Sequence, residues 1–141
     1  MRRSPLIYLG MCILVTACSF PEQNQLAASP AATNAVPELA TPYALQPAAG
    51  ICGQAEGQSV EIILEPGIPN PRCVQVIPSQ FLMVTNRTGQ FIAIGLGDER
   101  TGLGPGQSFS FDRPMGEMLA LGVHQLYVDP CCGGEIVLVA P

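Results

Sequence analysis

Short runs of Val, Ile and Phe separated by Gly, Pro and Asn fill residues 51–141, and this punctuation constrains the fold most strongly. No stretch of about ten residues in this region shows a helical period. Such a pattern is typical of an all-β domain, because the apolar runs have strand length and the separating residues favour turns. We therefore expect strands at residues 58–64, 73–77, 80–86, 90–96, 107–112, 122–129 and 134–139.

The run 107–112 shows the strand period most clearly. Phe109 and Phe111 alternate with Ser108 and Ser110, which predicts that the two rings face inward and the two serines outward. The length of the region suits a β-sandwich, which typically has roughly 100 residues.

The first 17 residues have the layout of a secretory signal peptide. Arg2 and Arg3 give a positive start, residues 6–15 an apolar stretch, and residues 16–17 are small. The apolar stretch is about half of the roughly 20 residues that a membrane-spanning helix needs. We interpret residues 1–17 as a cleaved signal peptide rather than a permanent membrane anchor.

Cys18 follows this segment, and Val15-Thr16-Ala17-Cys18 resembles the lipobox of bacterial lipoproteins. The resemblance implies that the Cys18 thiol is diacylated, that the chain is cleaved before it, and that the new amine is acylated. Palmitate-type chains would then hold the protein on the outer face of the plasma membrane, or in an outer membrane where one is present. The alternative is an ordinary signal peptide followed by a chance cysteine.

Residues 18–50 have the composition of a linker. Prolines interrupt any helix that the alanines could start; they stand at Pro21, Pro30, Pro37, Pro42 and Pro47. A flexible chain of this length spans about 30 Å end to end, enough to hold the domain at residues 51–141 clear of a membrane. The alternative is that residues 36–50 pack as an edge segment of that domain.

Charge restricts the partners of the mature chain. Removal of residues 1–17 takes away Arg2 and Arg3, which lowers the formal net charge from −5 to −7, and the sequence contains no lysine. An acidic surface of this kind argues against binding to nucleic acid and to anionic lipid headgroups. The expected membrane contact is therefore the lipid on Cys18, and the sequence names no protein or envelope partner.

Four cysteines remain in the domain: Cys52, Cys73, Cys131 and Cys132. An even number in an exported chain favours two disulfides. Neighbouring Cα atoms across a trans peptide are about 3.8 Å apart, below the usual disulfide range that starts near 4.4 Å. We therefore expect Cys131 and Cys132 to bind one to Cys52 and the other to Cys73. The alternative is a soft-metal or redox site.

The order of four C-terminal segments resembles that of a cupredoxin-like domain. The segments are Gln80–Asn86, Leu103–Ser108, Gly122–Cys131 and Glu135–Val139, within residues 73–139. The resemblance implies an antiparallel Greek-key β-sandwich, in which residues 122–131 correspond to the penultimate strand and the copper loop.

The copper chemistry of that family does not follow, because a type 1 copper site needs two His, one Cys and a weak axial ligand such as Met. The chain has a single histidine, His124, and Val128 follows Tyr127 where the family has its cysteine. No methionine occurs after Met118. Type 1 copper is therefore excluded on residue inventory, and we expect no cofactor.

Met115, Met118 and His124 could act as metal ligands or have structural roles. Met115 and Met118 suit Cu(I) as a thioether pair near His124, or they cover the end of the core from a loop. His124 lies in an alternating strand with Val123 and Tyr127 at odd offsets, so we expect it on the other face, at the surface or half-buried.

No set of residues indicates an enzyme, because the chain has one His, no Lys and no G-x-S-x-G run. Our hypothesis is a membrane-anchored extracytoplasmic lipoprotein that presents a non-catalytic β-sandwich for binding or envelope structure. The alternative is a periplasmic or extracellular copper or zinc carrier that uses Cys131, Cys132 and His124, with Met115 and Met118 as further ligands.

Overall fold

The computed structural model describes residues 38–141, so the signal peptide, Cys18 and the linker up to residue 37 lie outside the described residues. Within residues 38–141 almost all regular structure is β-strand, and the one helix there, α1 (Met115–Met118), is a single turn. No helix among residues 38–141 is long and apolar enough to cross a membrane. The strands are β1 (Gly53–Gln54), β2 (Ser59–Leu64), β3 (Cys73–Val76), β4 (Phe81–Asn86), β5 (Ile92–Leu96), β6 (Glu99–Leu103), β7 (Ser108–Ser110), β8 (Gly122–Gln125), β9 (Tyr127–Asp129) and β10 (Glu135–Leu138).

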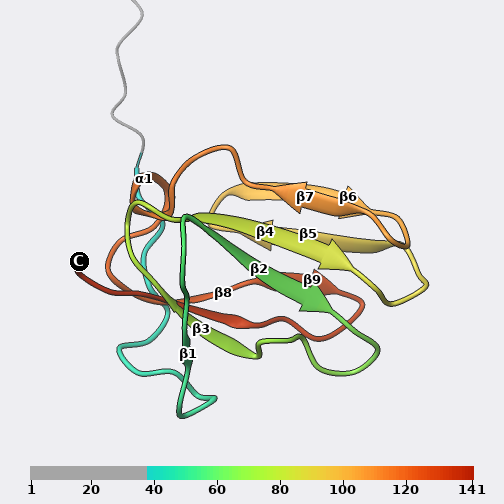
Figure 1. Cartoon of the computed structure of the whole chain (residues 1–141), viewed down its shortest axis with the longest axis horizontal. Helices are drawn as coiled ribbons and strands as arrows, with labels where there is room; N and C mark the ends of the chain where they lie inside the picture. The colour runs from blue at the N-terminus through green and yellow to red at the C-terminus, as the bar shows by residue number, and fades with distance from the viewer. Residues whose placement is uncertain (1–37) are drawn as a thin grey trace, which may run out of the picture. The chain divides into compact units, whose positions relative to one another are not determined.

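The strands form two layers, and the expectation of an all-β sandwich is confirmed (Figure 1). One layer has the order β2-β4-β7. The other contains β1-β3-β10-β8 and β6-β5-β9. These two groups are joined through one segment, because only Leu126 separates β8, which pairs with β10, from β9, which pairs with β5.

Pairing within the layers is mixed rather than wholly antiparallel, which corrects the expected antiparallel sheets. The pairs β2–β4, β1–β3 and β3–β10 are parallel, and the others are antiparallel. The reason is the connectivity: after β2 the chain crosses to the other layer as β3 and returns as β4. A strand that returns after such a crossover runs parallel to its predecessor, whereas a hairpin within one layer gives antiparallel neighbours.

The main core lies between the layers and follows the predicted alternation. Val60, Ile62 and Leu64 on β2 are buried, while the residues between them are more exposed. Phe111 is fully buried and Phe109 partly buried with its ring edge-on to Phe111, whereas both serines are exposed, as expected. Burial of each aliphatic or aromatic side chain contributes roughly 1.5–3 kcal/mol.

The N-terminal arm, residues 40–50, packs on the domain, so the predicted linker boundary at residue 50 is wrong and the edge-segment alternative is correct from residue 40. The Ala40 N–H donates to the Met118 carbonyl at 2.8 Å, and the Tyr43 N–H donates to the Val123 carbonyl at 2.9 Å. The arm therefore pairs with the edge of β8 that faces away from β10. This edge is available because β5 pairs with β9 and not with β8. Its alanines also cover a small second core formed by Cys52, Cys73, Val123 and Val137.

The disulfides are Cys52–Cys73 and Cys131–Cys132, so the predicted crossed pairing is wrong. Gly53 pairs with Val74 in the parallel β1–β3 ladder, and this register places Cys52 opposite Cys73 with Cα atoms 4.7 Å apart. The expected pairing rested on the Cα spacing of a trans peptide, and the peptide between Cys131 and Cys132 is cis in the structure.

Four connections lie together at one end of the sandwich, which we call the loop end (Figure 1). They are residues 65–72, 87–91, 104–107 and 130–134. Helix α1 and the C-terminus lie at the opposite end, which we call the α1 end. The arm joins the domain at the α1 end, because Ala40 is hydrogen-bonded to Met118 and Ala120.

Candidate functional site

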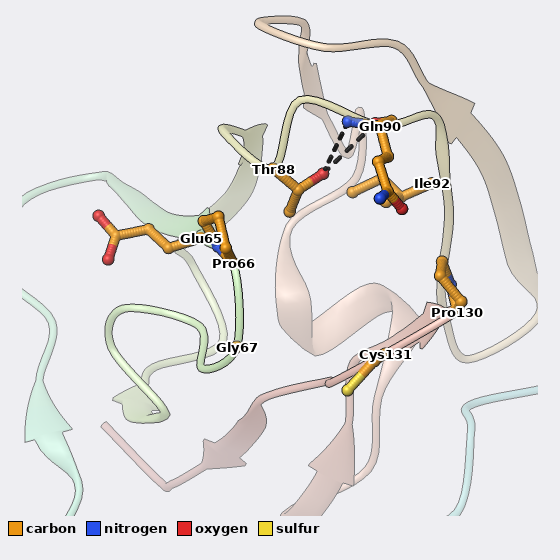
Figure 2. Close-up of a pocket in the computed structure, with 8 residues that line it drawn as sticks. All are labelled: Glu65, Pro66, Gly67, Thr88, Gln90, Ile92, Pro130 and Cys131. Carbon is orange, nitrogen blue, oxygen red and sulfur yellow. Dashed lines mark hydrogen bonds between the residues drawn. The ribbon is translucent and has the colours of Figure 1, made fainter.

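The loop end contains a cavity of about 190 Å³ between three connections of the sandwich (Figure 2). Its walls are mainly apolar, and the Glu65 carboxylate is directed away from the other lining side chains. The lining residues are Glu65, Pro66, Gly67, Thr88, Gln90, Ile92, Pro130 and Cys131.

Asn86 fixes the loop that forms one wall of this cavity. It is fully buried, and its amide nitrogen donates to the carbonyls of Gln90, Leu103 and Gly104 at 2.8, 3.0 and 3.1 Å. Its amide oxygen accepts from the backbone N–H and the hydroxyl of Thr88 at 2.9 and 2.7 Å. The sequence showed Asn86 only as the end of an expected strand; in the structure its amide holds residues 87–91 and 103–104 together.

The Cys131–Cys132 disulfide lies at the rim of the cavity. Both residues are exposed, and Cys131 lines the cavity. By contrast, Cys52 and Cys73 are buried, with 9 % and 4 % exposure. The two sulfur pairs of the domain therefore differ sharply in their access to solvent.

His124 does not lie where the sequence predicted. Its exposed fraction is only 4 %, and its Nε2 is 2.7 Å from the Ala120 carbonyl oxygen. The expected faces of β8 are reversed: His124 lies opposite Ile136 of the main core, whereas Val123 lies opposite Val137 of the second core, so His124 is on the inward face. A surface or half-buried position for His124 is therefore wrong.

The five residues weighed as metal ligands are not brought together. Met115 and Met118 are buried in the main core from α1, whereas Cys131 and Cys132 lie at the loop end (Figure 1). Within residues 38–141, no three His, Cys, Asp or Glu side chains group in a way that could hold a metal ion. The methionines cover the core, which is the structural role weighed for them above.

Glu135 forms a hydrogen-bonded cluster that the sequence analysis missed. Its carboxylate accepts from the backbone N–H groups of Ala48 and Ala49 at 2.9 and 2.7 Å, and from the Tyr43 hydroxyl. Burial raises the pKa of Glu135, but these hydrogen bonds, together with Arg72, outweigh it and hold the pKa below its ordinary value. The sequence signal for this cluster was a single acidic residue, Glu135, at the start of the otherwise apolar run 135–139.

The hydrogen bond between Tyr43 and Glu135 also changes the pKa of the tyrosine. Donation to the Glu135 carboxylate, with smaller contributions from burial and charge, raises the pKa of Tyr43 to about 12. Tyr43 and Glu135 thus fasten the arm to β10, and both groups are engaged in structure rather than directed into the loop-end cavity.

Comparison with known proteins gives similarity at the level of fold. No protein-family model matches the chain, and no curated protein sequence is similar to it. Among solved structures, a purple cupredoxin from Nitrosopumilus maritimus is 16 % identical, with a TM-score of 0.46, over 56 % of this chain and 98 % of that one.

Two further structures are of the same kind. The metal-binding domain, with Cu(I), of the Cu(I)-exporting P-type ATPase CopA of Streptococcus pneumoniae D39 is 14 % identical, with a TM-score of 0.49, over 63 % and 96 % of the two chains. A reduced amicyanin variant is 10 % identical, with a TM-score of 0.47, over 60 % and 86 %. These proteins are cupredoxin-like in fold, and identity this low says nothing about metal binding by the present chain.

Proposed function

We propose that this chain is a lipid-anchored extracytoplasmic protein whose β-sandwich has a binding or structural role in the cell envelope and no catalytic one. The observation that carries the proposal is the segment from Arg2 to Cys18, which has the layout of a lipoprotein signal. The structure adds support, because the four cysteines of the domain pair with one another as disulfides. Such pairing is typical of oxidising compartments outside the cytoplasm.

The place where the arm joins the domain supports a particular orientation of the domain relative to the membrane. The chain that carries Cys18 reaches the domain beside α1, so the α1 end is the end nearer to the anchor along the chain. A groove of about 390 Å³ lies there, and Leu39 and Leu121 at its edge are 41 % and 57 % exposed. None of its lining side chains is charged: Leu39, Pro78, Gly116, Leu119, Ala120, Leu121, Leu138, Ala140 and Pro141.

An uncharged apolar surface beside the tether suits contact with the lipid surface. Glu38 lies 20 positions after Cys18 in the sequence, and a flexible chain of that length spans about 25 Å, so this groove is within reach of the bilayer. In this arrangement the α1 end contacts the lipid and the loop end faces away from it. The loop-end cavity is then the part of the domain presented to partners.

Labelling with radioactive palmitate tests the anchor. We expect the wild-type protein and the Cys12→Ser variant to incorporate palmitate and the Cys18→Ser variant to incorporate none. Cys12 is the matched control because it lies in the same signal segment, upstream of the cleavage point. Equal labelling of Cys18→Ser and wild type, or no labelling of wild type, would contradict the proposal.

A further inference from the structure

The two disulfides of the domain differ in how an external thiol could reach them. Cys131 and Cys132 are exposed, and Cys131 lines the loop-end cavity, whereas Cys52 and Cys73 are buried beneath the N-terminal arm. Thiol–disulfide exchange requires a thiolate to reach one sulfur of the bond, so its rate depends on access. Of the two disulfides, only Cys131–Cys132 meets that requirement in the folded domain.

The two disulfides also differ in how much of the chain they hold. Cys131–Cys132 joins adjacent residues, whereas Cys52–Cys73 joins residues 21 apart and links the start of β1 to β3. In the chain-entropy account, a disulfide stabilises a fold by closing a loop of the unfolded chain, and the effect increases with loop length. Opening Cys131–Cys132 therefore leaves the strand pairing in place, and the domain stays folded.

The surroundings of Cys131 restrict what can approach it. The cavity beside it, about 190 Å³, is smaller than the roughly 300–1,000 Å³ typical of pockets for drug-sized ligands. Pro66, Ile92 and Pro130 give it apolar walls, and the Glu65 carboxylate is directed away from it. This space suits a small uncharged dithiol.

We propose that Cys131–Cys132 is a thiol–disulfide exchange site that accepts two electrons from a dithiol. The thiolate of the dithiol attacks the Sγ of Cys131, the Cys131–Cys132 bond breaks, and Cys132 leaves as a thiolate that takes up a proton. The second thiol of the donor then breaks the mixed disulfide, releases Cys131 as a thiol and closes the donor's own disulfide. The net change is a reduced Cys131 and Cys132 pair and one oxidised dithiol.

The test is a dithiothreitol titration of the full-length oxidised protein under native conditions. Samples are quenched with N-ethylmaleimide, and the labelled cysteines are assigned by mass spectrometry. We expect Cys131 and Cys132 to be labelled at dithiothreitol concentrations at least about tenfold below those that label Cys52 and Cys73, consistent with their different access. Circular dichroism should show an intact fold after this first step.

Matched variants separate the site from the fold. Cys131→Ser combined with Cys132→Ser should show no labelling in the first step and a melting temperature close to wild type. Cys52→Ser combined with Cys73→Ser should keep the first step and melt at a lower temperature. The proposal is overturned if both disulfides are reduced together in the folded protein, if Cys52–Cys73 is reduced first, or if Cys131 and Cys132 are labelled before any reductant is added.

The proposed anchor can fail independently of this site. An acylated Cys18 does not react with N-ethylmaleimide, whereas an unmodified Cys18 is labelled without reductant. That labelling would contradict the lipid anchor and leave the order of reduction of the two disulfides unaffected.

Discussion

At the scale of single residues, the buried amide of Asn86 holds the loop end together. This amide makes five hydrogen bonds, to Thr88 and Gln90 in the connection 87–91, to Leu103 at the end of β6 and to Gly104 after it. A buried polar group that loses its partner costs about 1–3 kcal/mol, and several groups depend on this one side chain.

Substitution Asn86→Ala should therefore lower the free energy of unfolding by about 3 kcal/mol, since it leaves the carbonyls of Leu103 and Gly104 without a side-chain donor. Urea denaturation measures this change. Gln58→Ala is the control, because Gln58 is exposed and its side chain makes no hydrogen bond within residues 38–141; it should unfold as wild type does. A loss below about 1 kcal/mol for Asn86→Ala would contradict the role assigned to the amide.

Some residue positions followed from the sequence and others did not. The inward rings of Phe109 and Phe111 were predictable, because alternation alone decides which face a strand residue occupies. The Cys52–Cys73 pairing was not, because it depends on the register of β1, a strand of two exposed residues without a pattern. The burial of His124 depends on the register of β8 against β10, which places it opposite Ile136 of the main core and which no local pattern reports.

At the scale of elements, the N-terminal arm depends on Glu135. The carboxylate holds the arm at three points, and its pKa lies below the ordinary value. A lowered pKa in the folded state means that the ionised group stabilises the fold above the unfolded pKa of about 4.3. This stabilisation is lost as the pH falls through the folded-state pKa.

Glu135→Gln should therefore destabilise the domain by about 2 kcal/mol at pH 7, where it replaces a hydrogen-bonded carboxylate by a neutral amide. The difference from wild type should shrink as the pH falls below about 4, because the wild-type carboxyl is then also neutral. Thermal melts from pH 7 to pH 3 measure both effects. Glu56→Gln, at an exposed glutamate, should follow wild type throughout; a Glu135→Gln curve parallel to wild type at all pH values would exclude this coupling.

Most strands were predictable, including the three-residue β7, whereas β1, β6 and α1 were not. β2, β4 and β5 lie within their predicted ranges, since each presents several apolar residues at the strand period. β6 was missed because its sequence, Glu-Arg-Thr-Gly-Leu, is polar and lies at the edge of its layer. α1 was missed because four residues are too few to display a helical period.

At the scale of the whole domain, the two ends of the sandwich differ in character. The α1 end carries the uncharged groove and the point where the arm joins, while the loop end carries the cavity and the exposed disulfide. The sequence could not assign these features to ends, because the assignment depends on how the connections between the two layers alternate.

Tryptophan fluorescence tests the orientation, since the chain contains no tryptophan of its own. Leu121 at the α1 end and Phe91 at the loop end are both exposed, at 57 % and 69 %, so Leu121→Trp and Phe91→Trp form a matched pair. In vesicles of brominated phosphatidylcholine that carry the acylated protein, we expect quenching and a blue shift for Leu121→Trp and neither for Phe91→Trp. Equal quenching of the two, or quenching of Phe91→Trp alone, would reject the orientation.

The anchor itself is tested most directly by the mass of the N-terminal peptide from protein extracted from membranes. We predict a peptide that begins at Cys18 and carries the mass of a diacylglyceryl group on sulfur and an acyl chain on the amine. A peptide that begins at Met1, or one that begins at an unmodified residue, would contradict it.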